Sequence, residues 1–148
     1  MTRVDFYVLQ DVAISALYRF ACRLASKAVR AGHQVIMHTK DEQSASEVDE
    51  LLWHYPDRRF LPHCTQSDGA STVAPIVVTW CEPPRYDGVL VNLTRTVPEF
   101  FGRFDRVAEI VVQDTREEGR DRYKFYRDRG FPLYHHELDD WETDQTAT

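Results

Sequence analysis

The chain has 148 residues and a formal net charge of -6 at pH 7, with 43% hydrophobic and 28% charged residues. This length and balance are typical of one soluble globular domain with its own core. The acidic balance argues against general affinity for the nucleic-acid backbone, because phosphate binding requires a concentrated basic surface. No stretch offers the roughly 18 apolar residues that a membrane span requires. The N-terminal stretch lacks a signal-peptide pattern, so we expect a cytoplasmic protein with no membrane partner.

The first elements along the chain alternate between strand and helix. Apolar residues alternate over Arg3–Leu9, which predicts a strand. Apolar residues then recur at helical spacing from Ile14, with basic residues in the last turns and Gly32 as the stop, which predicts a helix. A second strand is predicted over residues 34–39. The next helix is predicted over residues 41–55, with Asp41 as its N-cap.

The second half of the chain begins with a polar segment. Pro56 closes the second helix, and the residues from Asp57 to Ala74 predict a short apolar piece followed by a loop. Two compact β-rich runs follow at residues 75–80 and 88–93, separated by a turn-like segment. A helical turn around Phe100 and Phe101, a strand over Val107–Val112 and a helix starting at Asp114 complete the series.

This order of elements predicts the fold class. Strands that alternate with helices are typical of a single three-layer α/β domain with a mainly parallel central sheet flanked by helices. We assign residues 1–140 to this domain and residues 141–148 to a polar C-terminal tail that we expect to fray.

The first strand-to-helix junction argues against a dinucleotide site. Its sequence LQDVAISAL contains no glycine, and no phosphate-binding glycine motif occurs elsewhere in the chain. Backbone amides therefore cannot approach a pyrophosphate closely at this point. We expect no cofactor, although a nucleotide-binding α/β enzyme remains an alternative hypothesis.

The chain offers no convincing catalytic or metal site. The three cysteines are too scattered for a disulfide framework, and no C-x-x-C pair is present. His135 and His136 would point to opposite faces of a strand, which hinders joint ligation of one ion. Edge-strand histidines and packed thiols explain the set of candidate ligands better than a metal does. That set is Cys64, Cys81, His63, His135 and His136.

The helix predicted from Asp114 is unusually basic for an acidic chain. Successive helical residues are turned by about 100°, so four cations and one aromatic ring fall within an arc of roughly 100°. We call this set the basic stripe; it comprises Arg116, Arg120, Tyr123, Lys124 and Arg127. Acidic residues lie on an adjoining flank, and Gly119 lies on the opposite side, where it would permit close contact with the sheet.

Three interpretations of the basic stripe compete. Charge runs on helices are usually solvated surface, stabilised weakly by neighbouring opposite charges. Here, however, the cations segregate from the acids and surround an aromatic ring. Such a surface suits an acidic peptide with an apolar anchor, because Arg and Lys can clamp carboxylates while the ring flanks the anchor. Direct binding of single-stranded nucleic acid is the alternative, since bases stack on aromatics beside cations.

The sequence also resembles a known family. RDRYKFYRDRGF (residues 120–131), FYVL near the N-terminus and LLWHYPDRRFLPH in the middle are similar to the chi subunit of bacterial DNA polymerase III. The resemblance covers almost the whole chain, in order. It implies a Rossmann-like fold and a non-catalytic accessory subunit of the clamp-loader complex in DNA replication.

The resemblance also implies two protein partners and an indirect association with single-stranded DNA. The first partner is the acidic, phenylalanine-terminated tail of single-stranded DNA-binding protein, and the residues matched to its binding site are those of the basic stripe. Arg116 stands where the family often has lysine. The second partner is the psi subunit, matched to a surface around Trp53, Phe60, Pro62 and His63. The acidic C-terminal stretch would repel an acidic tail if it lay beside the basic helix.

Overall fold

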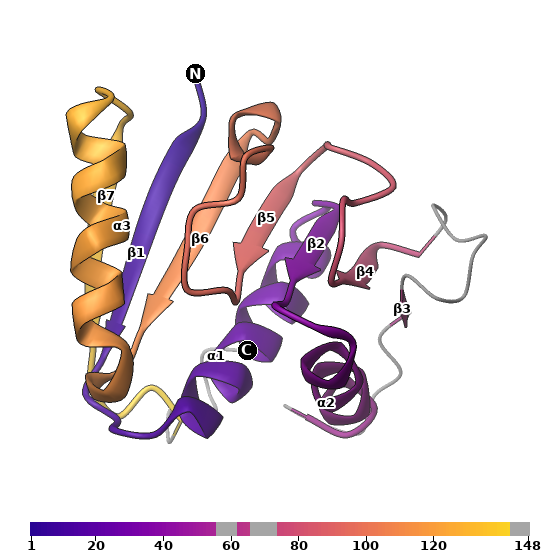
Figure 1. The fold of residues 1–148 in the computed structure, drawn as a ribbon. Coiled ribbons are helices and arrows are strands. Elements are labelled where there is room, and N and C mark those ends of the chain that lie inside the picture. The colour runs from indigo at the N-terminus through magenta and orange to yellow at the C-terminus, as the bar shows by residue number, and fades with distance from the viewer. Residues whose placement is uncertain (56–61, 66–73, 143–148) are drawn as a thin grey trace.

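The computed structural model describes residues 1–55, 62–65 and 74–142. Together they form seven strands and three α-helices (Figure 1). The strands are β1 (Arg3–Leu9), β2 (Val35–His38), β3 (His63–Thr65), β4 (Ile76–Thr79), β5 (Val89–Asn92), β6 (Arg106–Val111) and β7 (Leu133–Leu138). The helices are α1 (Ile14–Arg30), α2 (Glu42–Leu52) and α3 (Arg116–Asp128).

The strands form one sheet in the order β3-β4-β2-β5-β6-β1-β7, and every described pair is parallel. The first three residues of each of the central strands β2, β4 and β5 are buried, which explains why these residues are all apolar. The predicted α/β class with a parallel sheet is therefore confirmed.

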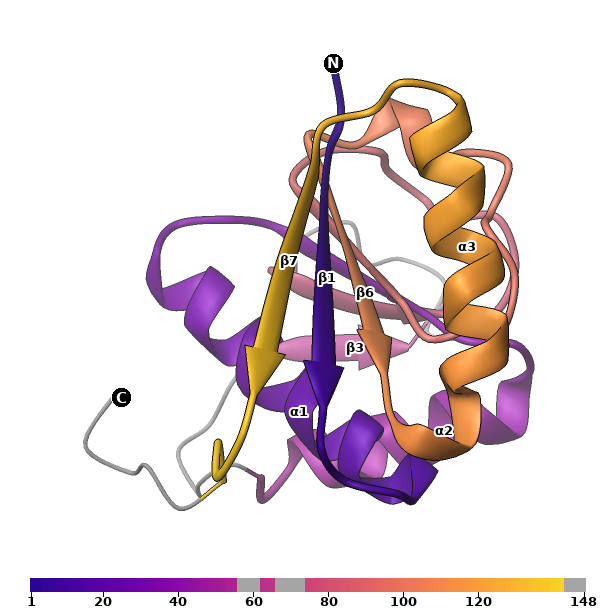
Figure 2. The same ribbon diagram turned by 90° about the vertical axis from the view of Figure 1, so that its left-hand side faces the viewer.

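Helices cover both faces of the sheet (Figure 2). One core cluster joins α1 and α2 to the first face through residues such as Phe20, Val48 and Val91. A second cluster joins α3 and the short 3-10 helix η2 (Phe101–Arg103) to the opposite face, with Phe6 and Tyr126 at its centre. The result is the three-layer arrangement that alternating strands and helices predict.

Some boundaries differ from the sequence predictions. The basic helix begins at Arg116 rather than Asp114, because a 3-10 turn, η3 (Gln113–Thr115), precedes it. The Val112 amide donates to the Thr115 hydroxyl at 3.1 Å and closes this turn. The segment after α2, predicted as a short apolar piece followed by a loop, contains strand β3, which is held by backbone pairing with β4 rather than indicated by a side-chain period.

The C-terminal segment is anchored up to Glu142. The Trp141 indole packs against Phe20 and donates to the Asp11 carboxylate at 2.8 Å. Glu142 accepts a hydrogen bond from Arg19 at 2.6 Å. Both contacts lie on the α1 side of the sheet, away from α3. Residues 143–148 of the predicted tail lie outside the described residues.

Gly119 brings α3 into close contact with the sheet. A Cβ at this position would lie 2.7 Å from Cγ2 of Val111 on β6, which is well inside van der Waals contact. Glycine is unfavourable inside a helix by about 1 kcal/mol relative to alanine. The close approach of α3 to β6 explains the glycine at position 119. The position of Gly119 opposite the basic stripe predicted this close contact with the sheet.

The substitution Gly119→Ala should lower stability despite the better helix propensity of alanine. Overpacking against Val111 typically costs about 1 to 3 kcal/mol, which exceeds the gain in propensity. We expect a net decrease in the free energy of unfolding, measured by urea denaturation. Gly102→Ala is the matched control, because no atom lies within 4 Å of a Cβ built there. An increase in stability for Gly119→Ala would contradict the close packing.

Candidate functional site

The basic stripe occupies the outer face of α3. Its four cations are exposed and Tyr123 is half-buried, whereas Gly119, Arg122 and Tyr126 are buried against the sheet. Within the described part of the chain, Arg116, Arg120 and Lys124 form no ion pair. Arg127 lies 3.2 Å from Asp128, but both side chains are more than half exposed, so this ion pair contributes little to the stability of the protein. The helix thus presents three exposed cationic groups, Arg116, Arg120 and Lys124, that no described residue pairs with.

Tyr123 borders the stripe on the side of β1. Its ring contacts the buried Phe6 ring edge to face, with a centroid distance of 5.2 Å. Phe6 in turn contacts Tyr126, so the aromatic residue of the stripe is fixed by the second core cluster. Tyr123 therefore supplies a positioned apolar surface beside the cations.

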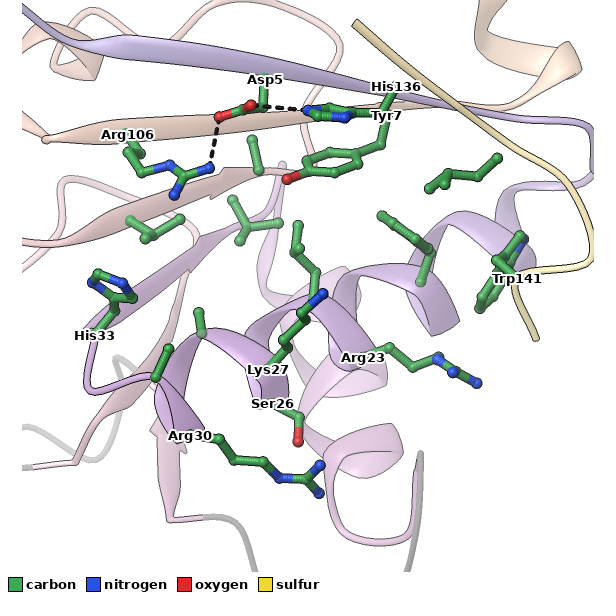
Figure 3. A pocket seen from close by; sticks show the side chains of 18 of the residues that line it. Asp5, Tyr7, Arg23, Ser26, Lys27, Arg30, His33, Arg106, His136 and Trp141 are labelled. Atoms are coloured by element: carbon green, nitrogen blue, oxygen red, sulfur yellow. Dashed lines mark hydrogen bonds and ion pairs between the residues drawn. The ribbon is translucent and has the colours of Figure 1, made fainter. Parts of the chain in front are cut away.

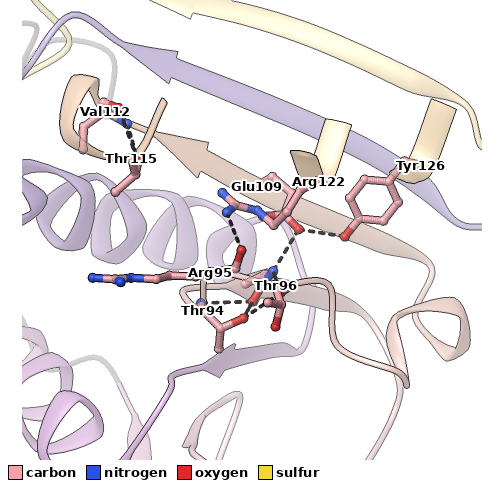
Figure 4. Close-up of polar contacts among 9 residues, drawn as sticks. Thr94, Arg95, Thr96, Glu109, Val112, Thr115, Arg122 and Tyr126 are labelled. Atoms are coloured by element: carbon pink, nitrogen blue, oxygen red, sulfur yellow. Dashed lines mark hydrogen bonds and ion pairs between the residues drawn. The ribbon is translucent and has the colours of Figure 1, made fainter. Parts of the chain in front are cut away.

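A buried polar network fixes α3 on the sheet. Arg122 Nε donates to Glu109 Oε1 at 2.7 Å, and both side chains are at most 5% exposed. The Tyr126 hydroxyl and the Asn92 amide donate to Glu109 Oε2 at 2.7 and 2.9 Å (Figure 4). Burial raises the pKa of the Glu109 carboxyl, and Arg122, Asn92 and Tyr126 act in the opposite direction. We call these four residues the Glu109 network.

The Glu109 network also reaches the loop after β5. Arg122 Nη1 donates to the carbonyl oxygen of Arg95 at 3.1 Å. Asn92 Nδ2 donates to the carbonyl of Thr96 at 3.0 Å, and Asn92 Oδ1 accepts from the Thr94 amide and hydroxyl. This network was not predicted from the sequence. Two features of the sequence could have indicated it: the acidic Glu109 inside the apolar strand sequence VAEIVV, and Arg122 on the inner side of the basic helix.

The surface around Trp53 lies near the opposite edge of the sheet, beside α2 and β3 (Figure 1). Trp53 is 56% exposed, and its ring contacts the His63 ring edge to face at 4.9 Å. His63 Nε2 lies 3.2 Å from Asp49 Oδ1, and Pro62 is exposed. Phe60, also predicted for this surface, lies outside the described residues.

A cavity of about 940 Å³ is separate from both surfaces. It lies between α1 and the strands β1, β5, β6 and β7 (Figure 3). Burial tends to raise the pKa of Asp5 at one end of it, yet hydrogen bonds from His136, Arg3 and Arg106 hold that pKa below its usual value. None of the basic-stripe residues lines this cavity.

Residues 1–55, 62–65 and 74–142 contain neither a cluster of metal-ligating side chains nor a membrane-spanning helix. Three or more His, Cys, Asp or Glu side chains do not come together there as an ion site. His136 faces Asp5 at 3.0 Å, whereas the neighbouring His135 lies 3.7 Å from Glu137. In the same part of the chain, no helix combines the length and apolarity needed to cross a membrane.

The chain is a three-layer α/β domain in which all described strand pairs are parallel. Its helix α3 carries exposed cations on the surface. Comparison with known proteins is more specific. Residues 1–134 match the family described as DNA polymerase III chi subunit, HolC, and the chain belongs to this family.

Named relatives support this assignment. The DNA polymerase III subunit chi of Pseudomonas aeruginosa is 44% identical over 141 residues, which cover 93% of this chain and 98% of that protein. The corresponding subunit of Escherichia coli K12 is 30% identical over 142 residues, covering 90% of this chain and 96% of the relative. The predicted family is therefore confirmed, and the chain is related to chi subunits of DNA polymerase III.

Because of the Glu109 network, alanine substitutions of two arginines on α3 should have unequal effects on stability. Arg122→Ala would leave a buried carboxylate without its cation and should destabilise the protein by about 3 to 5 kcal/mol. Arg120→Ala, on the exposed face, should change stability by no more than about 0.5 kcal/mol. Urea unfolding of both variants measures the difference. Equal stability of the two variants would show that the buried pair does not hold α3.

Proposed function

We propose that the protein is a non-catalytic accessory subunit of the DNA polymerase III clamp-loader complex, and that its basic stripe binds the acidic C-terminal tail of single-stranded DNA-binding protein. The observation that carries this proposal is the segregation of exposed cations around Tyr123 on α3. Three of the four cations have no ion-pair partner within the described residues. An acidic peptide ending in an apolar residue fits such a surface.

The physical roles of the stripe residues follow from their positions. Arg116, Arg120, Lys124 and Arg127 attract the acidic peptide and clamp its carboxylates, because charged hydrogen bonds are stronger than neutral ones. Tyr123 borders the surface on which the terminal phenylalanine packs. The fixed helix lowers the ordering cost of binding, since the cations project from a backbone that is already rigid.

The described end of the C-terminal acidic stretch lies away from the basic stripe. Trp141 contacts Phe20 and Glu142 accepts from Arg19, and both partners belong to α1 on the other face of the sheet. The acidic flank of α3 itself, formed by Glu117, Asp121 and Asp128, remains near the peptide. It favours binding in one position across the helix, because acidic side chains of the peptide avoid that flank.

We further propose that the surface around Trp53 pairs with the psi subunit. A large exposed aromatic side chain such as Trp53 is typical of a protein interface. Pro62 is also exposed, and Phe60 belongs to the proposed surface. The His63 side chain is only 1% exposed, so it supports the Trp53 ring from below rather than meeting a partner directly. Because this surface and the basic stripe lie at different ends of the sheet, one subunit can hold both partners at once and so associate indirectly with single-stranded DNA.

Calorimetric titration with the tail peptide tests the first interface. Arg120→Ala or Lys124→Ala should weaken binding by about 1 to 3 kcal/mol, the usual effect of losing a charged hydrogen-bond partner. Affinity should fall as salt is added, since exposed charges are screened. Lys27→Ala, an exposed cation on α1, is the control and should bind like the unmodified protein. Binding that is independent of salt and of the terminal phenylalanine would refute the proposal.

Titration with purified psi subunit tests the second interface. Trp53→Ala should weaken the association at least about tenfold, because tryptophans that become buried between two proteins are frequent hot spots of binding. Tyr134→Ala serves as the control, since Tyr134 is 46% exposed on β7 at the other edge of the sheet. Unchanged affinity of the Trp53 variant, measured by calorimetry, would exclude this surface.

A further inference from the structure

The connections that leave β2 and β5 diverge at the carboxyl edge of the sheet. These two strands are direct neighbours. The chain leaves β2 toward α2 on one face, whereas it leaves β5 toward η2 on the opposite face. In open parallel sheets, such a switch point leaves a crevice in which small ligands bind. The topology therefore marks this edge independently of any sequence motif.

A cavity of about 330 Å³ lies at this switch point. Its lining includes His38 at the end of β2, Lys40 after β2, Trp80 after β4, and Thr94, Arg95 and Thr96 after β5. We call it the switch-point crevice. Ligand pockets span roughly 300 to 1,000 Å³, so this one has room for a ligand near the lower limit.

The crevice combines cations, hydroxyl groups and an aromatic ring. Lys40 and Arg95 are exposed, whereas Trp80 is half-buried and packs against the first core cluster. Burial lowers the pKa of His38 to about 4, so this side chain is neutral at pH 7 and adds no charge. Its Nδ1 lies 2.8 Å from the Thr79 hydroxyl, which fixes the ring. The positive charge of the crevice therefore comes from Lys40 and Arg95.

The loop that carries Arg95 is held rigidly. Arg122 binds its backbone carbonyl, and Asn92 binds Thr94 and Thr96 on either side of it. The Arg95 side chain extends away from these contacts (Figure 4). The Glu109 network thus positions this arginine as well as the basic stripe. A rigid loop loses little entropy when a ligand binds.

We propose that the switch-point crevice binds a nucleotide unit, with the phosphate held by Lys40 and Arg95 and the base packed on Trp80. Cations bind phosphate oxygens through charge-assisted hydrogen bonds, and every nucleobase has a face that stacks on an aromatic ring. The start of α2 is not the phosphate site, because Asp41 already accepts from the Ser44 amide there at 2.7 Å. The site binds without catalysis and is separate from the basic stripe.

A phosphate with an attached base can reach the crevice in two forms: as a free nucleotide or as a nucleotide within single-stranded DNA. Titration of isotopically labelled protein with thymidine monophosphate, ATP or a short oligothymidylate, followed by amide NMR, distinguishes them. A nucleotide that binds at the crevice should shift the resonances of His38, Trp80 and residues 94–96. Tighter binding of the oligothymidylate identifies the strand as the source, and tighter binding of a mononucleotide identifies the free ligand.

Variants separate the crevice from the basic stripe. Lys40→Ala and Arg95→Ala should each weaken nucleotide binding about tenfold while leaving tail-peptide binding unchanged. Arg120→Ala with Lys124→Ala should do the reverse, so failure of one site is distinguishable from failure of the other. All four side chains are exposed, so the fold should persist. The proposal is overturned if millimolar nucleotide shifts none of these resonances, or if the shifts persist in Lys40→Ala with Arg95→Ala.

Discussion

The buried ion pair between Glu109 and Arg122 is the constraint on which the position of α3 and its basic stripe depends. A carboxylate in the middle of β6 is costly to bury unless a cation and hydrogen-bond donors meet it. Arg122 supplies the cation, and Asn92 and Tyr126 supply further donors. Because Arg122 and Tyr126 both belong to α3, these contacts fix the rotation of the helix. The same rotation directs the basic stripe outward.

The close approach at Gly119 completes this constraint. Packing against Val111 sets the distance between helix and sheet, while the Glu109 network sets the register along and around the helix axis. Specific packing and satisfied buried polar groups together favour one arrangement over near alternatives. The cations are exposed because the inner face of the helix is fully occupied. Their exposure is thus a consequence of the core rather than of surface charge alone.

The arrangement of surfaces suits a linking subunit. The basic stripe covers the face above β1 and β6, while the surface around Trp53 lies toward β3 at the other edge of the sheet. Because the two proposed binding surfaces lie on different parts of one sheet, two partners need not compete for them. The switch-point crevice lies between them, at the carboxyl ends of the central strands. The Glu109 network that fixes α3 also binds the loop after β5, which lines this crevice. One buried network therefore positions both the basic stripe and the switch-point crevice.

The sequence by itself determined the parallel α/β class and the composition of the basic stripe, because both depend on local periods of two and about 3.6 residues. It also carried the resemblance to the chi family, which the comparisons confirm. Only the tertiary structure decided that Glu109 meets Arg122, that strand β3 forms, and that Lys40, Trp80 and Arg95 share one crevice. These features join residues far apart in the chain, and their contacts depend on strand order and on which face each connection takes.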